Sequence, residues 1–168
     1  MIRKENVMDK TTFTPGEDGK TLVVERAFNA PVSIVWNYWT KAELLDQWWA
    51  PSPWKAVTKS MDFSEGGRWH YYMEGPEGER HYCLVDYKTI DPEKSFTALD
   101  GFCDEEANRN YELPTNDWHN QFIDKDGHTH LIVTLTFETP EDLQKIVEMG
   151  FKEGFTQGLD QLETLLTK

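Results

Sequence analysis

A two-residue alternation of hydrophobic and polar side chains runs through the middle of this chain, between Trp54 and Glu138. This period puts successive side chains on opposite faces of a β-strand, so that one face can be buried. In "GRWHYYMEG", Trp69, Tyr71 and Met73 therefore share a face. Turn signals in "GG", "GPEGE", "DPEK" and "KDGH" separate the alternating runs. We predict a mostly antiparallel sheet with five strands in this region.

Two further strands are predicted nearer the N-terminus, where "TTFT" and "TLVVERAF" are joined by the turn sequence "PGEDGK". In the later run "HLIVTLTFE", the residues expected to face inward are Leu131, Val133, Leu135 and Phe137. A long polar segment, "CDEEANRNYELPTND", interrupts the alternating region and is too irregular for a strand. Loops of this length are usually functional or disordered, and whether residues 104–117 form a lid stays open.

Two short helices are predicted between the N-terminal strands and the alternating region. "APVSIVWNYWT" begins with Pro31, which suits the first turn of a helix because its missing N–H costs nothing there. Its apolar residues at helical spacing are Val32, Val35, Trp36 and Trp39. The second helix is expected to begin at Thr40, which has the capping-box spacing to Glu43, and to end before the prolines at 51 and 53.

A long amphipathic helix is predicted at the C-terminus, with Thr139 as N-cap and Pro140 at its first position. One continuous hydrophobic ridge is expected from Leu143, Val147, Phe151, Phe155, Leu159, Leu162 and Leu166. Glycines recur beside this ridge at positions 150, 154 and 158, and each costs about 0.8–1.0 kcal/mol against alanine. They indicate either close helix packing or a kink at Gly150, or else a void left for a ligand.

Composition limits the class of protein. The chain has 168 residues, enough for one domain, which we place at residues 11–168 after a frayed segment at 1–10. Its net charge of −13 disfavours nucleic acid and anionic membranes as partners. No apolar run is long enough for a membrane helix, and "MIRKENVMDK" lacks the apolar core of a signal peptide. Two cysteines are typical of a reduced cytosolic pair, so we expect a cytoplasmic protein.

Motifs of catalysis and metal binding are missing from the sequence: there is no phosphate loop, G-x-S-x-G, H-E-x-x-H or C-x-x-C. His128 and His130 lie near two aspartates and could hold a metal, but we interpret them as a polar hairpin face. Asp86 interrupts an apolar strand, where it could point inward and act as a base with a raised pKa. We expect instead that it faces water on the other side of the sheet. We predict no metal, no cofactor and no identified catalytic residue.

The segments "ERAFNAPVSIVWNYWTKAELLDQWWAP", "GGRW" and "GFKEGFTQGLDQLETLL" resemble the START-like (SRPBCC) superfamily. The branch they are most similar to is that of the activator of the heat-shock chaperone ATPase, and the resemblance covers residues 20–167. It implies an α+β helix-grip fold, in which a curved antiparallel sheet wraps a long C-terminal helix around an internal cavity. The order of elements predicted from periodicity agrees with that fold.

The tryptophans divide into two groups under this fold. Trp36 and Trp39 are expected in the core, whereas the other tryptophans of residues 35–54 should lie near the mouth of the cavity. The residues that we predict to contact a ligand are Trp48, Trp49, Trp54, Trp69, Tyr71, Met73, Cys83, Cys103, Phe151 and Phe155. Tyr71 could orient the ligand with a hydrogen bond.

Three functions remain open on the sequence. The leading one is a module that binds a small apolar or aromatic molecule, with a link to stress responses implied by the resemblance. The second is a protein that interacts with a chaperone, and the third is an enzyme similar to polyketide cyclases. A monomer and a homodimer fit the sequence equally well.

Overall fold

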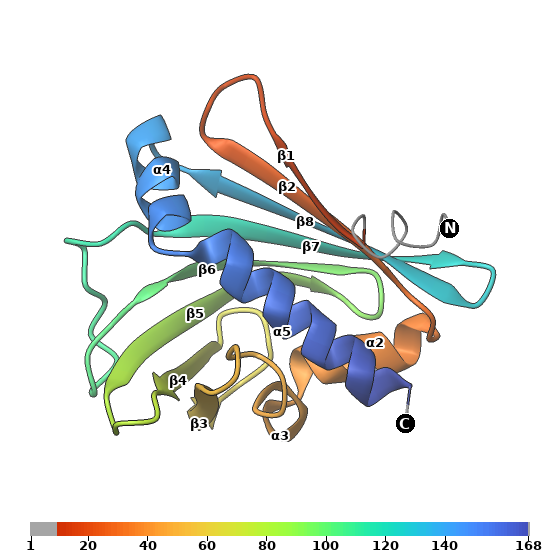
Figure 1. The fold of residues 1–168 in the computed structure, drawn as a ribbon, viewed down its shortest axis with the longest axis horizontal. Helices are drawn as coiled ribbons and strands as arrows, with labels where there is room; N and C mark the ends of the chain where they lie inside the picture. Colours follow the sequence, from red (N-terminus) through yellow and green to blue (C-terminus); the bar gives the residue numbers. More distant parts are fainter. Residues whose placement is uncertain (1–9, 168) are drawn as a thin grey trace.

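The computed structural model describes residues 10–167, which form a curved antiparallel sheet with helices packed on one face (Figure 1). The strands, in chain order, are β1 (Thr11–Pro15), β2 (Thr21–Phe28), β3 (Lys55–Met61), β4 (Arg68–Glu74), β5 (Arg80–Asp91), β6 (Ser95–Phe102), β7 (Asn116–Lys125) and β8 (His128–Phe137). The sheet order is β1-β2-β8-β7-β6-β5-β4-β3, and neighbouring strands pair antiparallel. The predicted helix-grip fold is confirmed. Of the segment predicted to be frayed, residues 1–9 lie outside the described part.

The prediction of five strands between Trp54 and Glu138 was wrong, because β3 to β8 all lie in this region. The hydrophobic alternation is weakest in β3, where Ala56 alone is buried and the register with β4 shifts between Thr58 and Ser60. The predicted turns do separate the strands. At "KDGH", for example, Asp126 and Gly127 both have positive φ, as a tight two-residue hairpin requires.

The helices begin with α2 (Val32–Thr40), which packs its tryptophans against the inner face of the sheet. Trp36 meets the rings of Phe63, Phe96 and Phe122 edge-on, at centroid distances of 5.8, 5.8 and 5.1 Å. Trp39 is buried as well, so both residues belong to the core as predicted. The inward residues predicted for β8 (Leu131, Val133, Leu135 and Phe137) are also buried.

The predicted capping box of the second short helix was wrong. Helix α3 spans Ala42–Leu45, and the residue at its N-cap position is Lys41. Thr40 still belongs to α2, and its hydroxyl donates to the Trp36 carbonyl at 2.8 Å. Because that hydroxyl already serves the end of α2, it does not cap α3. Trp48 and Trp49 follow α3 in a turn and are not part of a helix.

The C-terminal helix is divided in two at Gly150, which corrects the prediction of one continuous ridge. Helix α4 (Pro140–Glu148) has Thr139 as its N-cap, as predicted, and α5 (Phe151–Leu166) lies across the sheet (Figure 1). Gly150 has φ +96, a left-handed conformation that L side chains rarely adopt. The kink that was one of the explanations for the glycines is therefore present at this position.

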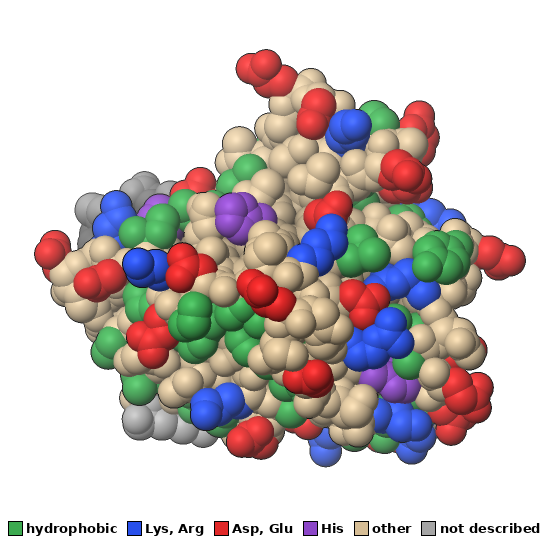
Figure 2. Space-filling view, turned by 180° about the vertical axis from the view of Figure 1, so that it is seen from behind, with side chains coloured by type: hydrophobic (Ala, Val, Ile, Leu, Met, Phe, Trp, Pro, Cys, Tyr) green, Lys and Arg blue, Asp and Glu red, His purple; other side chains and the backbone are tan. Residues whose placement is uncertain are grey.

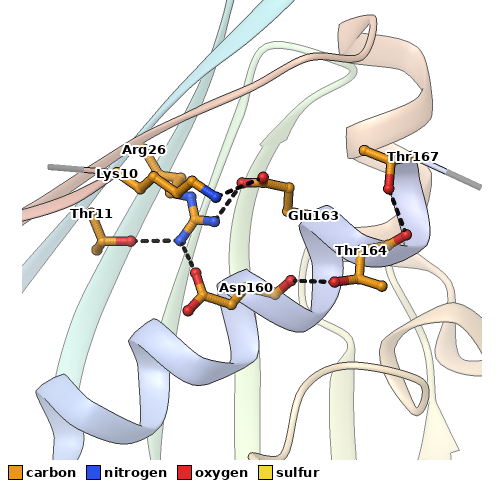
Figure 3. Close-up of polar contacts among 7 residues, drawn as sticks. All are labelled: Lys10, Thr11, Arg26, Asp160, Glu163, Thr164 and Thr167. Atoms are coloured by element: carbon orange, nitrogen blue, oxygen red, sulfur yellow. Dashed lines mark hydrogen bonds and ion pairs between the residues drawn. The ribbon is translucent and has the colours of Figure 1, made fainter. Parts of the chain in front are cut away.

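Helix α5 is held to the N-terminal strands by Arg26, whose side chain is fully buried (Figure 3). Its guanidinium donates to Asp160 at 2.7 Å and to Glu163 at 2.6 Å, both on α5, and also to Thr11 of β1. Burial alone would raise the pKa of Glu163, but hydrogen bonds from Arg26 and Lys10 hold it below its usual range. The network therefore fixes the position of α5 over the sheet.

The opposite face of the sheet carries polar and charged side chains. Seen from behind, acidic and basic side chains are interspersed, with hydrophobic side chains in small groups among them (Figure 2). Asp86 lies on this face and pairs with Arg68 and with Arg109 of the 103–115 loop, so the outward interpretation is confirmed. The carbonyl of Asp104 in the same loop meets His70 at 3.2 Å. None of the helices within residues 10–167 is long and apolar enough to cross a membrane.

Candidate functional site

A cavity of about 460 Å³ lies between the inner face of the sheet and helices α4 and α5. Strands β4 to β8 form its floor, and the segment between α3 and β3 forms one side. Its apolar wall is rich in aromatic side chains, namely Trp49, Trp54, Phe102, Trp118, Phe151 and Phe155. The other apolar side chains of the wall are Pro51, Met73, Pro114, Leu135, Ile146 and Met149. A concave site of this size with apolar walls is typical of small-molecule binding sites.

Two of the three glycines in the C-terminal region border this cavity, and the third does not. A Cβ atom at Gly154 would meet, among the described residues, one ring carbon of Pro51 at 3.7 Å, an ordinary contact. Gly158 instead approaches the backbone of the α3–β3 segment, where a Cβ would lie 3.3 Å from the Trp48 carbonyl. The glycines therefore serve different ends: Gly150 breaks the helix, Gly154 leaves space in the cavity, and Gly158 permits close packing.

Asp100 supplies the carboxyl group at the floor of the cavity. It follows Phe96 and Ala98 on the inner face of β6, so the curvature of the sheet brings its carboxyl among apolar side chains. Burial raises the pKa of this carboxyl to about 7, although nearby Arg109 acts in the opposite direction. Asp100 keeps a small accessible surface, and this surface faces the cavity. A carboxyl in this state can accept or donate a hydrogen bond near neutral pH.

Buried polar atoms without a partner cluster around Asp100. Asn116 lies directly opposite it on β7, and Trp118 and Asn120 follow on the same face. Within residues 10–167, the Asn116 Nδ2 and Asn120 Oδ1 atoms make no hydrogen bond. The indole N–H of Trp118 has no partner in good hydrogen-bond geometry among these residues, but it lies close enough to the Asp100 carboxyl to lower its pKa. A second, small cavity of about 30 Å³ adjoins Asp100, Trp118 and Asn120 and is large enough for a water molecule. Buried polar atoms are rarely left unpaired, so this cluster is suited to hold a polar group or water.

Tyr71 supplies another polar group to the cavity. Its hydroxyl oxygen accepts a hydrogen bond from Trp49 Nε1 at 2.7 Å, and its ring stacks on Trp69 at 4.0 Å. Burial raises the pKa of Tyr71 and of neighbouring Cys83 well above their usual values. Both groups are therefore neutral at physiological pH, which makes Tyr71 available as a hydrogen-bond donor and Cys83 a weak nucleophile.

The cavity brings together most of the predicted ligand contacts, namely Trp49, Trp54, Tyr71, Met73, Cys83, Phe151 and Phe155. The others lie elsewhere. Trp48 is buried in the core against Trp39, Trp69 borders the small cavity, and Cys103 begins the polar loop. The role of all these residues in ligand binding stays a prediction.

The polar floor was missed in the sequence. In "SFTALDGF", the two-residue alternation places Asp100 on the same face as Phe96 and Phe102, and this pattern indicates an inward-facing carboxyl. Asn116 was assigned to the polar insertion, whereas it is the first residue of β7. Neither residue stands out in the sequence, because polar side chains are mostly exposed in folded proteins.

The histidine hairpin shows no arrangement for a metal ion. His130 meets Glu25 across the sheet at 3.0 Å, and His128 is exposed at the strand end. Over the described range 10–167, no three histidine, cysteine or acidic side chains converge as metal ligands.

Comparison with known proteins places the chain among bacterial structures of the same fold. Protein Ms6760 from Mycobacterium smegmatis is 32% identical, with a TM-score of 0.85, over 93% of this chain and 96% of that one. A protein from Arthrobacter aurescens is 28% identical, with a TM-score of 0.87, over 93% and 91%. The family model for Activator of Hsp90 ATPase homolog 1-like protein matches residues 29–167. No curated protein matches the chain.

Proposed function

Because the chain belongs to the family of Activator of Hsp90 ATPase homolog 1-like proteins, we propose that it is a ligand-binding module of that family. Its ligand is a small apolar or aromatic molecule, held between the sheet and helices α4 and α5. We further propose that it acts in the cytoplasm and takes part in a stress response, either as a monomer or as a homodimer.

The observation that carries this proposal is the cavity of about 460 Å³, whose apolar wall is rich in aromatic side chains. Interiors of folded proteins are close-packed, and voids larger than a water molecule are few. In a cavity of this size, the lining side chains lose packing contacts that a filled core would give them. Gly154 enlarges the cavity because it has no side chain. A bound apolar molecule would restore those contacts.

The test is binding of Nile red, a neutral fluorescent probe, by the wild type and by Gly154→Leu and Gly154→Ala. A leucine at this position would extend into the cavity, so we expect it to weaken binding by about tenfold or more. The alanine variant is the matched control and should bind as the wild type does. Equal binding by the leucine variant, shown to be folded by circular dichroism, would contradict the proposal, as would a wild type that does not bind the probe.

A second candidate function is interaction with a chaperone, which the family name favours. The acidic balance of the chain, −13 in net charge, would suit a basic partner surface. The measurement is the ATPase rate of an Hsp90-type chaperone with and without the protein. A rate that does not change at saturating protein would remove this candidate.

A third candidate is an enzyme acting on an enclosed aromatic or polyketide substrate, and the Asp100 carboxyl favours it. A pKa of about 7 suits proton transfer near neutral pH. Turnover that survives Asp100→Asn would exclude Asp100 as the acid or base.

A further inference from the structure

The cavity has one polar end, formed by Asp100 and Asn116. These residues are direct partners across β6 and β7, so their side chains leave the sheet on the same face, about 4.5–5.5 Å apart at Cβ. Both line the large cavity, opposite the aromatic side chains of α5. Tyr71 and His81 also line the cavity, but the Tyr71 hydroxyl already accepts from Trp49 Nε1 and His81 is exposed. Asp100 and Asn116 are therefore the polar pair that a ligand meets at this end of the cavity.

Asn116 is almost entirely buried, and its Nδ2 donor makes no hydrogen bond to any residue of the described chain. The Nδ2 atom is itself buried, so the amide must turn to bring it to a ligand, and this rotation breaks no hydrogen bond of that atom. A buried donor left unpaired is costly, so a ligand that accepts from it regains part of that free energy. Asn116 therefore favours a ligand with an acceptor atom at this end.

Asp100 imposes the complementary requirement. Its carboxyl accepts hydrogen bonds when ionised and can also donate one when protonated, both of which occur near neutral pH. A ligand carboxylate would be repelled by the ionised form. An ammonium group would be attracted by it, but it has no acceptor for Asn116 and would lose its hydration in an apolar cavity.

A hydroxyl group satisfies both residues, since it has one donor and two acceptor lone pairs and carries no charge. From this geometry we propose that Asp100 and Asn116 select a neutral aromatic ligand that carries a hydroxyl group, a phenol or a close analogue. The hydroxyl donates to Asp100 and accepts from Asn116 Nδ2, and its ring lies among Trp49, Phe151 and Phe155. This proposal rests on the proposed function and adds the chemical class of the ligand.

The test compares 2-naphthol with 2-methylnaphthalene, which has a similar shape and no hydrogen-bonding group, by calorimetry on the full chain. We expect the wild type to bind 2-naphthol about tenfold more tightly, as one or two buried hydrogen bonds allow. Charged analogues, 2-naphthoate and 2-(aminomethyl)naphthalene, should bind more weakly than 2-naphthol. In Asn116→Leu and Asp100→Leu, the preference for 2-naphthol should fall toward one, while 2-methylnaphthalene still binds.

The matched control is Asp117→Asn, a neighbouring residue that is exposed on the other face and pairs with Lys88. It should leave the preference unchanged. Equal binding of 2-naphthol and 2-methylnaphthalene by the wild type would overturn the selection and leave the cavity proposal standing. Tighter binding of the amine would overturn the assignment to a hydroxyl, and binding of none of the four probes would overturn the proposed function itself. These outcomes need the wild type alone, so a variant that fails to fold does not prevent the test.

Discussion

Asp100 shows how its surroundings on the inner face of β6 change the chemistry of a single residue. Burial raises its pKa to about 7, whereas an aspartate in an unfolded chain has a pKa of about 3.9. The folded state therefore holds a proton that the unfolded state has lost between these values. The contribution of Asp100 to stability is fully present below about pH 4 and is lost as the pH rises through about 7.

We therefore expect Asp100→Asn, which cannot ionise, to gain stability relative to the wild type as the pH rises from about 5 to about 8. The expected change in the difference between their free energies of unfolding is about 1–3 kcal/mol. Urea titrations at the two pH values measure it. If the difference between the free energies of unfolding of the two proteins stayed constant with pH, water would have to reach Asp100 freely in the folded state.

Trp36 and Trp54 differ in how far they are buried, and this sets the cost of truncating them. Trp36 contacts three phenylalanine rings and is 7% exposed, so Trp36→Ala should lower the free energy of unfolding by about 3–5 kcal/mol. Trp54 lies at the cavity against His81 and is only partly buried, so Trp54→Ala should cost no more than about half as much. Denaturant titrations followed by circular dichroism compare the two, and the reverse order would contradict this division of the tryptophans.

Helices α4 and α5 offer a test of packing through their glycines. Gly154→Ala should stabilise the protein by up to about 1 kcal/mol, because the new methyl group makes ordinary contacts and favours the helix. Gly158→Ala should leave the protein less stable than Gly154→Ala by about 1 kcal/mol, since its methyl group would lie 3.3 Å from the Trp48 carbonyl oxygen and overpacking offsets the gain in helix propensity. Gly150→Ala should cost about 1–2 kcal/mol because of the positive φ at this position.

Thermal melts of the three alanine variants check this order. A Gly154 variant that melts clearly earlier than the wild type would mean that the helix packs tightly at this point, and the glycine would then no longer support a cavity.

The elements that could be predicted are those whose hydrophobic pattern and capping residues match the burial that they have in the fold. Strand β8 alternates cleanly, and Thr139 with Pro140 marks the start of α4, because local pattern and burial act in the same direction there. The sequence predicts a kink at Gly150 only as one of several explanations for the glycines, because the hydrophobic residues keep helical spacing on both sides of it. The start of α3 was wrong because Thr40 had two possible hydrogen-bond partners, and the contact with Trp36 formed instead of the cap.

At the scale of the whole molecule, the resemblance and the period of the sequence together predicted the helix-grip fold and about half of the apolar residues that line the cavity. They did not predict the polar floor. Asp100 and Asn116 become neighbours only through the pairing of β6 with β7 across the long loop, and this register is a long-range property. Strand alternation indicates which face a residue is on, but it does not show which residue lies opposite.

The central claim is that the space between the sheet and helices α4 and α5 binds a small aromatic molecule. The most direct measurement is a titration with 2-methylnaphthalene, followed by the indole N–H signals in proton–nitrogen NMR spectra. The account predicts that the signals of Trp49, Trp54 and Trp118, which line the cavity, shift together and reach saturation, while that of Trp36 in the core changes little. Indole signals that stay unchanged at saturating probe would contradict it, as would shifts of backbone amide signals centred on exposed residues such as Tyr111 and Ile34.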